Sequence, residues 1–493
     1  MSDIASTTKA SDKATKRATA GYARYVFWVM FGISFINYLD RYVLTGAANI
    51  VAKELNFSLA GIGYIASAFL IVYTLGTIPL GIWADRTKRH NVVAICVAIW
   101  SVATIGTVLA TNFITLFISR MILGIGEAGY FPAGTALMSD YFSRKKRSRI
   151  MSTWSAAQYI GILGGFVLGG ALAGLYPGSW RLAFLFTGIP GLILAFFAWR
   201  VREPRRNQAD EEEQEGQEGQ EGQEQHSTSS ASIAIEELTE SKEIGRDTPV
   251  TTQSQQNVFA QFKLLLNIKT VIVLIVMQVF AFFVLGVNVT FLPTYLQQKD
   301  TFGFSSGAAG LFSGAVIVLA GGAGTLLGGY MADMLNRRYP GARVLVCGIG
   351  FLLGAPSFAI AISYHSIGIF TVFFVLTTLL LSIYNGPSTA ATQDVVPSVL
   401  RASAVAVSLL IAHLLGDAFA PTLVGILATQ FDPTHGTHFA NNMAGQDLSH
   451  ALLITCTPAL VIAGLVGLLG ARWMKSDITA AEEADKQRVN AVQ

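Results

Sequence analysis

The stretch Gly81-Ile-Trp-Ala-Asp85-Arg86-Thr-Lys88-Arg89 decides the fold, because an altered copy of it recurs as Gly329-Tyr-Met-Ala-Asp333-Met-Leu-Asn-Arg337-Arg338. Each copy follows the second long apolar run of its half of the chain. A Gly-x-x-x-Asp turn that ends in clustered bases, placed twice at matching positions, indicates a doubled bundle of membrane helices.

The composition supports a polytopic membrane protein. Of 493 residues, 52% are hydrophobic and only 13% are charged, whereas a soluble globular chain carries about 25% charged residues. The mean hydropathy is +0.50. The 48 glycines fit as well, because small residues allow membrane helices to approach closely.

The apolar runs predict twelve membrane-spanning helices in two sets of six, since each span needs about 20 apolar residues. The expected fold is therefore all-α and integral to the membrane, with two pseudo-symmetric six-helix bundles. The expected spans are 25–46, 61–82, 91–110, 113–138, 150–174 and 180–200 in the first half, and 269–292, 306–332, 342–362, 366–387, 401–428 and 449–472 in the second.

The bases predict the orientation, because loops rich in Lys and Arg stay in the cytoplasm. One side of the predicted bundle has few bases, namely Lys53, Arg181 and Lys299. The other side collects Lys9, Lys13, Lys16, Arg17, Arg24, Arg86, Lys88, Arg89, Arg144 to Arg149, Arg200 to Arg206, Arg337, Arg338, Arg343, Arg401, Arg472 and Lys475. We expect both termini in the cytoplasm, a plasma (inner) membrane location and a monomer. Residues 1–20 lack the apolar region of a cleavable signal peptide.

An acidic segment separates the two halves. Thirteen of the 31 acidic residues lie between Asp210 and Asp247, together with two of the 34 bases, which leaves 32 basic and 18 acidic residues elsewhere. Low-complexity, acidic sequence without aromatic residues cannot form a packed core. The expected domains are a cytoplasmic tail (1–24), a six-helix bundle (25–202), a disordered cytoplasmic linker (203–262), a second bundle (263–473) and a cytoplasmic tail (474–493).

Other functional classes are disfavoured. The three cysteines, Cys96, Cys347 and Cys456, lie inside apolar runs without metal-ligand spacing, so buried thiols are expected. The bases cluster in short loops, which is the pattern of membrane orientation and not of nucleic-acid binding. No catalytic residue, cofactor or metal is expected.

Charged residues at membrane depth are costly and mark substrate or ion paths. Asp40 and Arg41 occur in Asn37-Tyr-Leu-Asp40-Arg41, and Arg120 lies on the fourth predicted helix. At about 1.5 Å per residue, Asp40 and Arg120 reach similar depths. Glu127 lies two helical turns after Arg120 and shares its face. We therefore expect these charges to gather in one place.

This arrangement predicts different roles for the arginine and the carboxylates. Arg120 stays charged and is suited to holding an anionic group through bidentate hydrogen bonds. Desolvation of Asp40 or Glu127 would suit either carboxylate to exchange a proton. The alternative is an ion-pair network that only holds the first and fourth helices together.

His413 and Asp417 are four residues apart on the eleventh predicted helix and share a face near the membrane midplane. A histidine there is suited to relaying a proton or contacting a substrate. The alternative is a buried imidazole satisfied by Asp417. In the preceding helix, Asn385-Gly386-Pro387 predicts a kink.

The two repeated loops predict a cytoplasmic gate made of Gly81, Asp85, Arg86, Arg89, Gly329, Asp333, Arg337 and Arg338. In this hypothesis Asp85 caps a facing helix and pairs with Arg86 or Arg89. Asp333 would pair with Arg337 and Arg338 in the same way. The alternative is plain turn capping together with orientation charge.

The repeated loops, with Arg120-x-x-x-Gly124-x-Gly126-x-Ala128, resemble the major facilitator superfamily over nearly the whole chain. Within it, the sequence is most like the spinster-type lipid transporters, through Asn37-Tyr-Leu-Asp40-Arg41, Gly124-Ile-Gly-Glu127-Ala, Gly386-Pro387, Val395-Val-Pro397 and His413-Leu-Leu-Gly-Asp417-Ala with Pro421. The resemblance implies a proton-linked carrier in which Asp40, Arg41, Arg120 and Glu127 line the polar cavity, with Asn37 beside them. The acidic linker belongs to no pattern of that family.

The sequence therefore predicts a secondary active transporter that moves an amphiphilic or anionic organic solute by proton-coupled alternating access within the lipid bilayer. A symporter for small organic acids, such as sugar acids or aromatic carboxylates, is the alternative. A more distant one is a membrane sensor that signals through the acidic linker. An enzyme is not expected, because no nucleophile-and-base spacing occurs.

Overall fold

The computed structural model describes residues 2–204, 209, 265–432 and 443–492. Within these ranges every regular element is a helix. Nearly all of the linker expected over 203–262 lies outside the described residues, and the side chains of residues 1–20 do as well.

Six helices form the first half of the chain, and each expected span of this half falls on one of them. α1 is much longer than its span, since it begins at Ser2, and Pro79, Pro132 and Pro190 lie inside their helices without ending them. The six helices are α1 (Ser2–Glu54), α2 (Leu59–Arg86), α3 (Arg89–Thr107), α4 (Phe113–Tyr141), α5 (Arg144–Ala173) and α6 (Trp180–Trp199).

The second half repeats this arrangement, but three of its spans are interrupted. The elements are α9 (Lys269–Gln297), α10 (Ser306–Ala315) with η1 (Val316–Ala320) and α11 (Gly321–Asn336), α12 (Ala342–Ser363), α13 (Ile367–Ser382) with α14 (Asn385–Asp394), α15 (Arg401–Ala412) with η3 (His413–Asp417) and α16 (Ala420–Phe431), and α17 (Ala444–Gly470). The break between α13 and α14 lies just before Gly386-Pro387, where the kink was predicted. The segments η1 and η3 are π-helical, a form that often marks functional sites.

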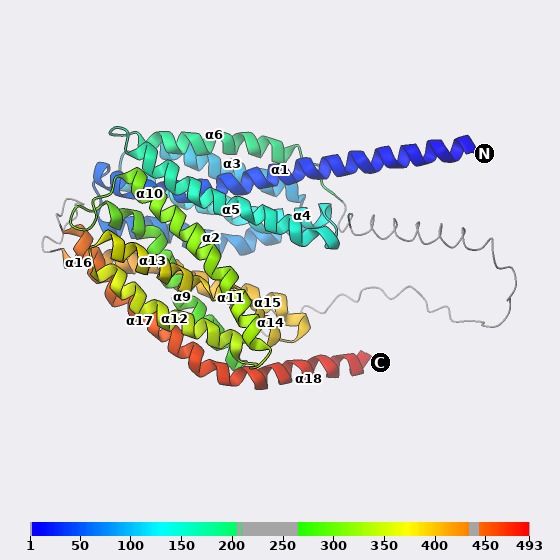
Figure 1. Cartoon of the computed structure of the whole chain (residues 1–493). Coiled ribbons are helices and arrows are strands. Elements are labelled where there is room, and N and C mark those ends of the chain that lie inside the picture. The colour runs from blue at the N-terminus through cyan, green and yellow to red at the C-terminus, as the bar shows by residue number, and fades with distance from the viewer. Residues whose placement is uncertain (1, 205–208, 210–264, 433–442, 493) are drawn as a thin grey trace.

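Among the described residues, eleven helical spans are long and apolar enough to cross a membrane. The twelfth is α1, whose middle carries the polar residues Asn37, Asp40 and Arg41. In Figure 1 the helices from α1 to α6 form one side of the molecule, and most of the later helices form the other. The start of α1 and the end of the final helix α18 (Met474–Val492) lie at the same end, here named the terminal end.

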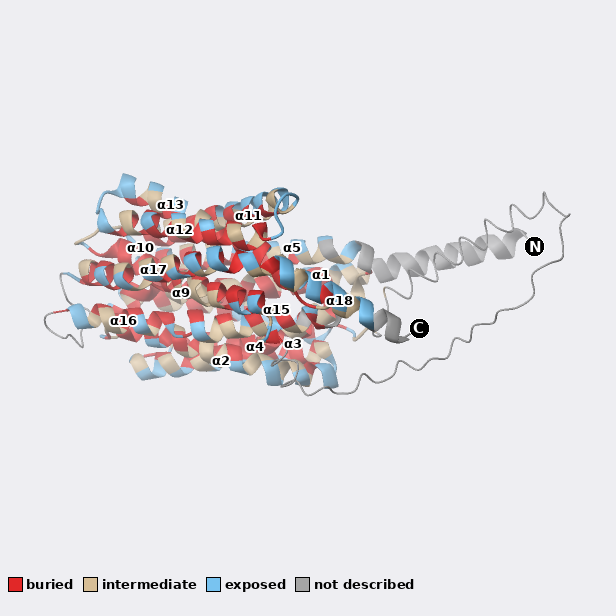
Figure 2. Cartoon of the chain, turned by 90° about the horizontal axis from the view of Figure 1, so that it is seen from below, coloured by how far each residue is buried: buried red, intermediate tan, exposed pale blue. Residues whose placement is uncertain are grey.

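The two bundles meet at the other end, here named the opposite end. There α2 packs against α16, α5 against α10 and α1 against α9. The approach is close enough that Gly63 on α2 has no room for a side chain against the backbone of Pro421. Figure 2 shows buried residues along most of the central length of the helices.

Four hydrogen bonds that involve side chains join described residues of the two bundles, and all four lie at the opposite end. The ion pairs between described residues at the terminal end stay within one bundle. The conformation is therefore closed at the opposite end.

Candidate functional site: a cavity between the two bundles

A cavity of about 290 Å³ lies between the bundles, and both halves line it. The first half contributes Arg41 and Arg120, while the second half contributes His413 and Asp417. Apolar and aromatic residues from α1, α2, α4 and α9 form most of the remaining wall. Four of the seven residues predicted for the site therefore face one cavity.

Arg41 pairs with Glu127. Arg41 Nη2 lies 2.6 Å and Nε lies 3.0 Å from Glu127 Oε2, which joins α1 to α4. The Glu127 side chain is fully buried behind Arg41, whose own side chain is 16% exposed. Glu127 Oε1 is buried without a hydrogen-bond partner among the described residues. Because Glu127 itself does not line the cavity, Arg41 stands between this carboxylate and any solute.

Aromatic rings hold the other faces of the Arg41 guanidinium. Its Cζ lies 5.1 Å from the ring centres of Tyr38 and Phe69 and 4.6 Å from that of Tyr73. Rings within about 6 Å attract a cation through their quadrupoles. This group of rings was not predictable from charge at membrane depth, because Phe69 and Tyr73 lie on α2, which carries no charge there.

Among the described residues, the direct contacts of Arg120 are with neutral groups. Its Nη2 donates to Thr107 Oγ1, its Cζ lies 5.0 Å from the Phe184 ring centre, and its Nε is buried without a partner among the described residues. Arg120 and Glu127 share α4 as expected, but the ion pair of Glu127 is made with Arg41.

Asp40 lies on another face of α1 from the cavity. The hydroxyl of Thr104 on α3 donates to Asp40 Oδ2, and that of Thr187 on α6 donates to Oδ1 at 3.1 Å. Asp40 interacts with Arg120 through space, without a direct ion pair among the described contacts. Asn37 is also buried, and its Nδ2 lacks a partner among the described residues. Neither residue lines the cavity in this conformation, so the expected lining differs for Asp40, as it does for Glu127.

His413 and Asp417 occupy the π-helical segment η3. His413 Nδ1 lies 3.0 and 3.2 Å from the two carboxylate oxygens of Asp417. The Phe282 ring meets the imidazole edge to face at 4.6 Å between ring centres. The imidazole is thus satisfied by Asp417, as one hypothesis expected, and it also lines the cavity. A role in proton relay or substrate contact stays a prediction.

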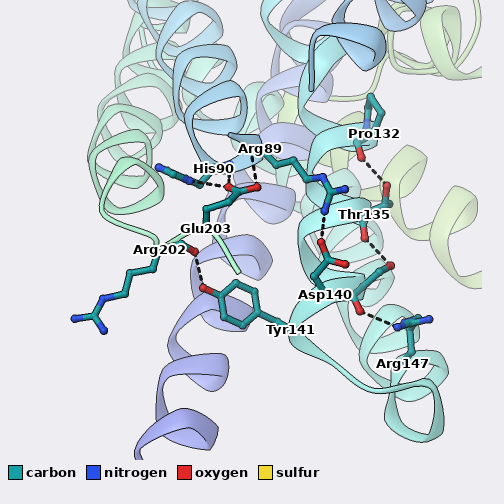
Figure 3. Close-up of polar contacts among 10 residues, drawn as sticks. Arg89, His90, Pro132, Thr135, Asp140, Tyr141, Arg147, Arg202 and Glu203 are labelled. Carbon is teal, nitrogen blue, oxygen red and sulfur yellow. Dashed lines mark hydrogen bonds and ion pairs between the residues drawn. The ribbon is translucent and has the colours of Figure 1, made fainter. Parts of the chain in front are cut away.

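The loop of the first half forms a polar cluster at the terminal end (Figure 3). Arg89 at the start of α3 pairs with Asp140 near the end of α4. Glu203 accepts hydrogen bonds from the backbone N–H groups of Arg89 and His90 at 3.1 and 3.2 Å, and its Oε2 lies 2.8 Å from His90 Nδ1. A carboxylate at this position accepts hydrogen bonds from the unpaired N–H groups of the first turn. It also interacts favourably with the positive end of the helix dipole.

The second half repeats the main ion pair. Arg343 at the start of α12 pairs with Asp394 at the end of α14, and its Nη2 lies 3.1 Å from Asp333. In both halves the arginine and the aspartate are 51 residues apart in the sequence.

These contacts differ from the predicted gate. Arg89 pairs with Asp140, and Asp333 pairs with Arg343 rather than with Arg337 or Arg338, which are exposed. Asp85 and Arg86 are exposed as well, although Asp85 does have an interaction. Gly81 and Gly329 have room for a side chain in this conformation. The described pairs tie helices together within each bundle, and none of them bridges the two bundles.

Comparisons with known proteins agree with this architecture. Residues 30–421 match the model of the Major Facilitator Superfamily. The Protein spinster homolog 1 of Xenopus laevis is 24% identical over 491 residues, which cover 94% of this chain and 85% of that protein. A D-galactonate transporter of Escherichia coli is 29% identical over 334 residues, which cover 65% of this chain and 70% of that protein.

The fold also matches a solved structure. The crystal structure of a bacterial homologue of the human lysosomal transporter Spinster, in an inward-facing and unoccupied conformation, aligns with a TM-score of 0.74. It is 23% identical, and the alignment covers 92% of this chain and 98% of that one. The chain therefore belongs to the Major Facilitator Superfamily of membrane transporters, and within it the chain is similar to the spinster proteins.

Proposed function

We propose that this transporter moves an amphiphilic or anionic organic solute by proton-coupled alternating access. The observation that carries the proposal is the contrast between its two cavity arginines. Glu127 pairs directly with Arg41, whereas the direct contacts of Arg120 among the described residues are with a hydroxyl and an aromatic ring, and Asp40 acts on it only through space. A buried arginine without a carboxylate partner is suited to binding an anionic group, through charge-assisted hydrogen bonds.

The ion pair supplies a route to proton coupling. Protonation of Glu127 removes the charge that holds Arg41, which leaves a second guanidinium available to the anion. Conversely, a bound anion beside Arg41 and Arg120 favours the protonated form of Glu127. Substrate and proton thus bind together, because each strengthens the binding of the other.

The wall of the cavity supports a substrate with an apolar part. Ile62 and Ile65 on α2 and Leu285 and Val289 on α9 line it beside the two arginines. An anionic headgroup at Arg120 therefore has apolar surface on both bundles for the adjoining chain.

Small organic acids are the second candidate. A volume of about 290 Å³ lies at the lower end of small-molecule sites, so a long acyl chain would extend beyond it. The similarity to a D-galactonate transporter supports the same candidate. Against it, the residues that line the cavity include no Lys or Arg from the second half that would hold a second carboxylate.

The proposed direction of access follows from the bases. The basic loops lie at the terminal end, which we assign to the cytoplasm by the positive-inside rule. The closed opposite end would then face outward.

Substrate exchange in proteoliposomes tests the role of Arg120. Labelled lysophospholipid and labelled aldonic acid would be compared in the wild type, Arg120→Ala and Arg120→Lys, with Arg181→Ala as the control at the opposite end. We expect exchange of one substrate class to be lost in Arg120→Ala and partly kept in Arg120→Lys. Equal affinity in the wild type and Arg120→Ala would contradict the proposal.

A further inference from the structure

Three buried amide side chains join the bundles at the opposite end. Asn49 on α1 lies between Gln297, the last residue of α9, and Gln298, which follows it. Asn49 Nδ2 donates to Gln297 Oε1 at 3.2 Å, and Gln298 Nε2 donates to Asn49 Oδ1 at 3.1 Å. The three residues are 4%, 8% and 5% exposed. Among the described residues, these are the side chain to side chain hydrogen bonds that cross between the bundles.

Both glutamines are held in place by their own helix. Gln297 Nε2 donates to the Pro293 carbonyl and Gln298 Nε2 to the Thr294 carbonyl, each at 2.9 Å. The last turn of a helix leaves carbonyl groups without intrahelical partners. The amide groups of α9 are therefore oriented toward α1 before the bundles meet.

The amide triad lies just beyond the closed end of the cavity. Asn49 is one helical turn after Thr45 on α1, and Gln297 is about two turns after Thr290 on α9. Thr45 and Thr290 both line the cavity. Any opening toward the opposite end must separate α1 from α9 at this level.

We infer that the triad Asn49–Gln297–Gln298 is the latch of the closed end and sets the fraction of time for which that end stays shut. This inference rests on the proposed alternating access. The two other bonds between the bundles run from backbone N–H groups to hydroxyls at 3.3 Å and are longer.

Removing one amide weakens the closed state selectively. In the closed state an amide atom that loses its cross-bundle partner, such as Gln297 Oε1 in Asn49→Ala, would be buried without that bond, whereas in the open state water satisfies it. Loss of both cross-bundle bonds should therefore shift the equilibrium toward opening by roughly fivefold to thirtyfold.

Thiol labelling from the opposite side tests the latch. A cysteine introduced by Thr45→Cys provides the reporter, since Cys96, Cys347 and Cys456 are buried. A membrane-impermeant maleimide would be added only to the side that faces the closed end, in vesicles of uniform orientation. Asn49→Ala, which removes both cross-bundle bonds, should raise the labelling rate by roughly fivefold or more, and Gln298→Met, which removes one of them, should raise it by a smaller factor. The matched control is Ser449→Ala, because the described hydrogen bonds of the Ser449 hydroxyl, to Tyr295 and Gly445, lie within the second bundle.

The double variant Asn49→Ala/Gln298→Met separates a latch from general loosening. If the residues act through their shared bond, the double variant labels less than the product of the two single effects predicts. The inference would be overturned if the two single effects multiplied in the double variant. It would also be overturned if Ser449→Ala labelled as fast as Asn49→Ala. Labelling needs neither substrate nor a proton gradient, so failure of proton coupling would leave this result intact.

Discussion

Arg41 on α1 and Glu127 on α4 form a buried ion pair, with 2.6 Å between Arg41 Nη2 and Glu127 Oε2, and the arginine alone faces the cavity. Arg120, two helical turns from Glu127, faces the same cavity with neutral partners. Breaking a buried pair by removal of one partner leaves an uncompensated charge. In the proposed mechanism, the protonation state of Glu127 therefore sets how much positive charge the cavity offers to a solute.

Glu127→Gln should abolish proton-driven accumulation while substrate exchange persists. The glutamine mimics the protonated carboxyl and leaves Arg41 permanently released. The measurement compares uptake under an imposed pH gradient with exchange at equal pH. Glu54→Gln serves as the control, since Glu54 lies at the opposite end and pairs with Arg181. Uptake by Glu127→Gln that remains fully coupled to protons would remove this residue from the coupling mechanism.

Asp140→Asn should destabilise the fold much more than Asp333→Asn. The side chains of Arg89 and Asp140 are 11% and 8% exposed, whereas that of Asp333 is 70% exposed. Loss of one partner from a buried pair costs about 3 kcal/mol, and loss of an exposed pair costs at most about 1 kcal/mol. Thermal unfolding in detergent at a fixed scan rate measures the difference. Equal losses of Tm in the two variants would show that the Arg89–Asp140 pair is weak.

The ion pairs Arg89–Asp140 and Arg343–Asp394 show which features were predictable from the sequence and which were not. The repeated Gly-x-x-x-Asp turns predicted a doubled bundle, and the expected twelve-helix fold is confirmed. The partner of Arg89 and the whole Arg343–Asp394 pair were missed, because Asp140 and Asp394 lie 51 residues after their arginines, at the ends of other helices. The equal spacing in both halves was the signal that would have found them.

The cavity was predictable in part. Charge at membrane depth identified Arg41, Arg120, His413 and Asp417, all of which line it. Helical periodicity gives the depth of a residue and the face it shares with neighbours on its own helix. It does not give the direction in which that face points within a bundle. Asp40 and Arg41 are adjacent, yet they point toward α3 and α4, respectively. A polar contact between helices is also not predictable from the charge pattern when the partner is a threonine, such as Thr104.

Acid should weaken the contact of Glu54 with Arg181 at the opposite end. Burial raises the pKa of Glu54, but hydrogen bonds from Arg181 at 2.5 Å and from the Gly178 N–H at 2.8 Å outweigh it and lower the pKa below the ordinary 4.5. A carboxyl group whose pKa is lower in the folded than in the unfolded state contributes its full stabilisation above pH 4.5. This contribution is lost as the pH falls through the pKa of the folded state.

The stability of Glu54→Gln as a function of pH measures that contribution. The Tm difference between the wild type and Glu54→Gln should be largest near neutral pH and should shrink as the pH falls below 4.5. Added salt should reduce it, because the pair is partly exposed. A Tm difference that grows toward acid would contradict the assignment of the depressed pKa to this contact.

The most direct test of the account is solute-induced proton movement in proteoliposomes that enclose a pH-sensitive dye. Lysolipids and small organic acids would be added separately, with Glu127→Gln as the matched variant. The account predicts that one class moves protons with the wild type and that neither class does so with Glu127→Gln. Solute flux without any proton movement in folded wild-type protein, or proton movement that Glu127→Gln retains, would contradict it.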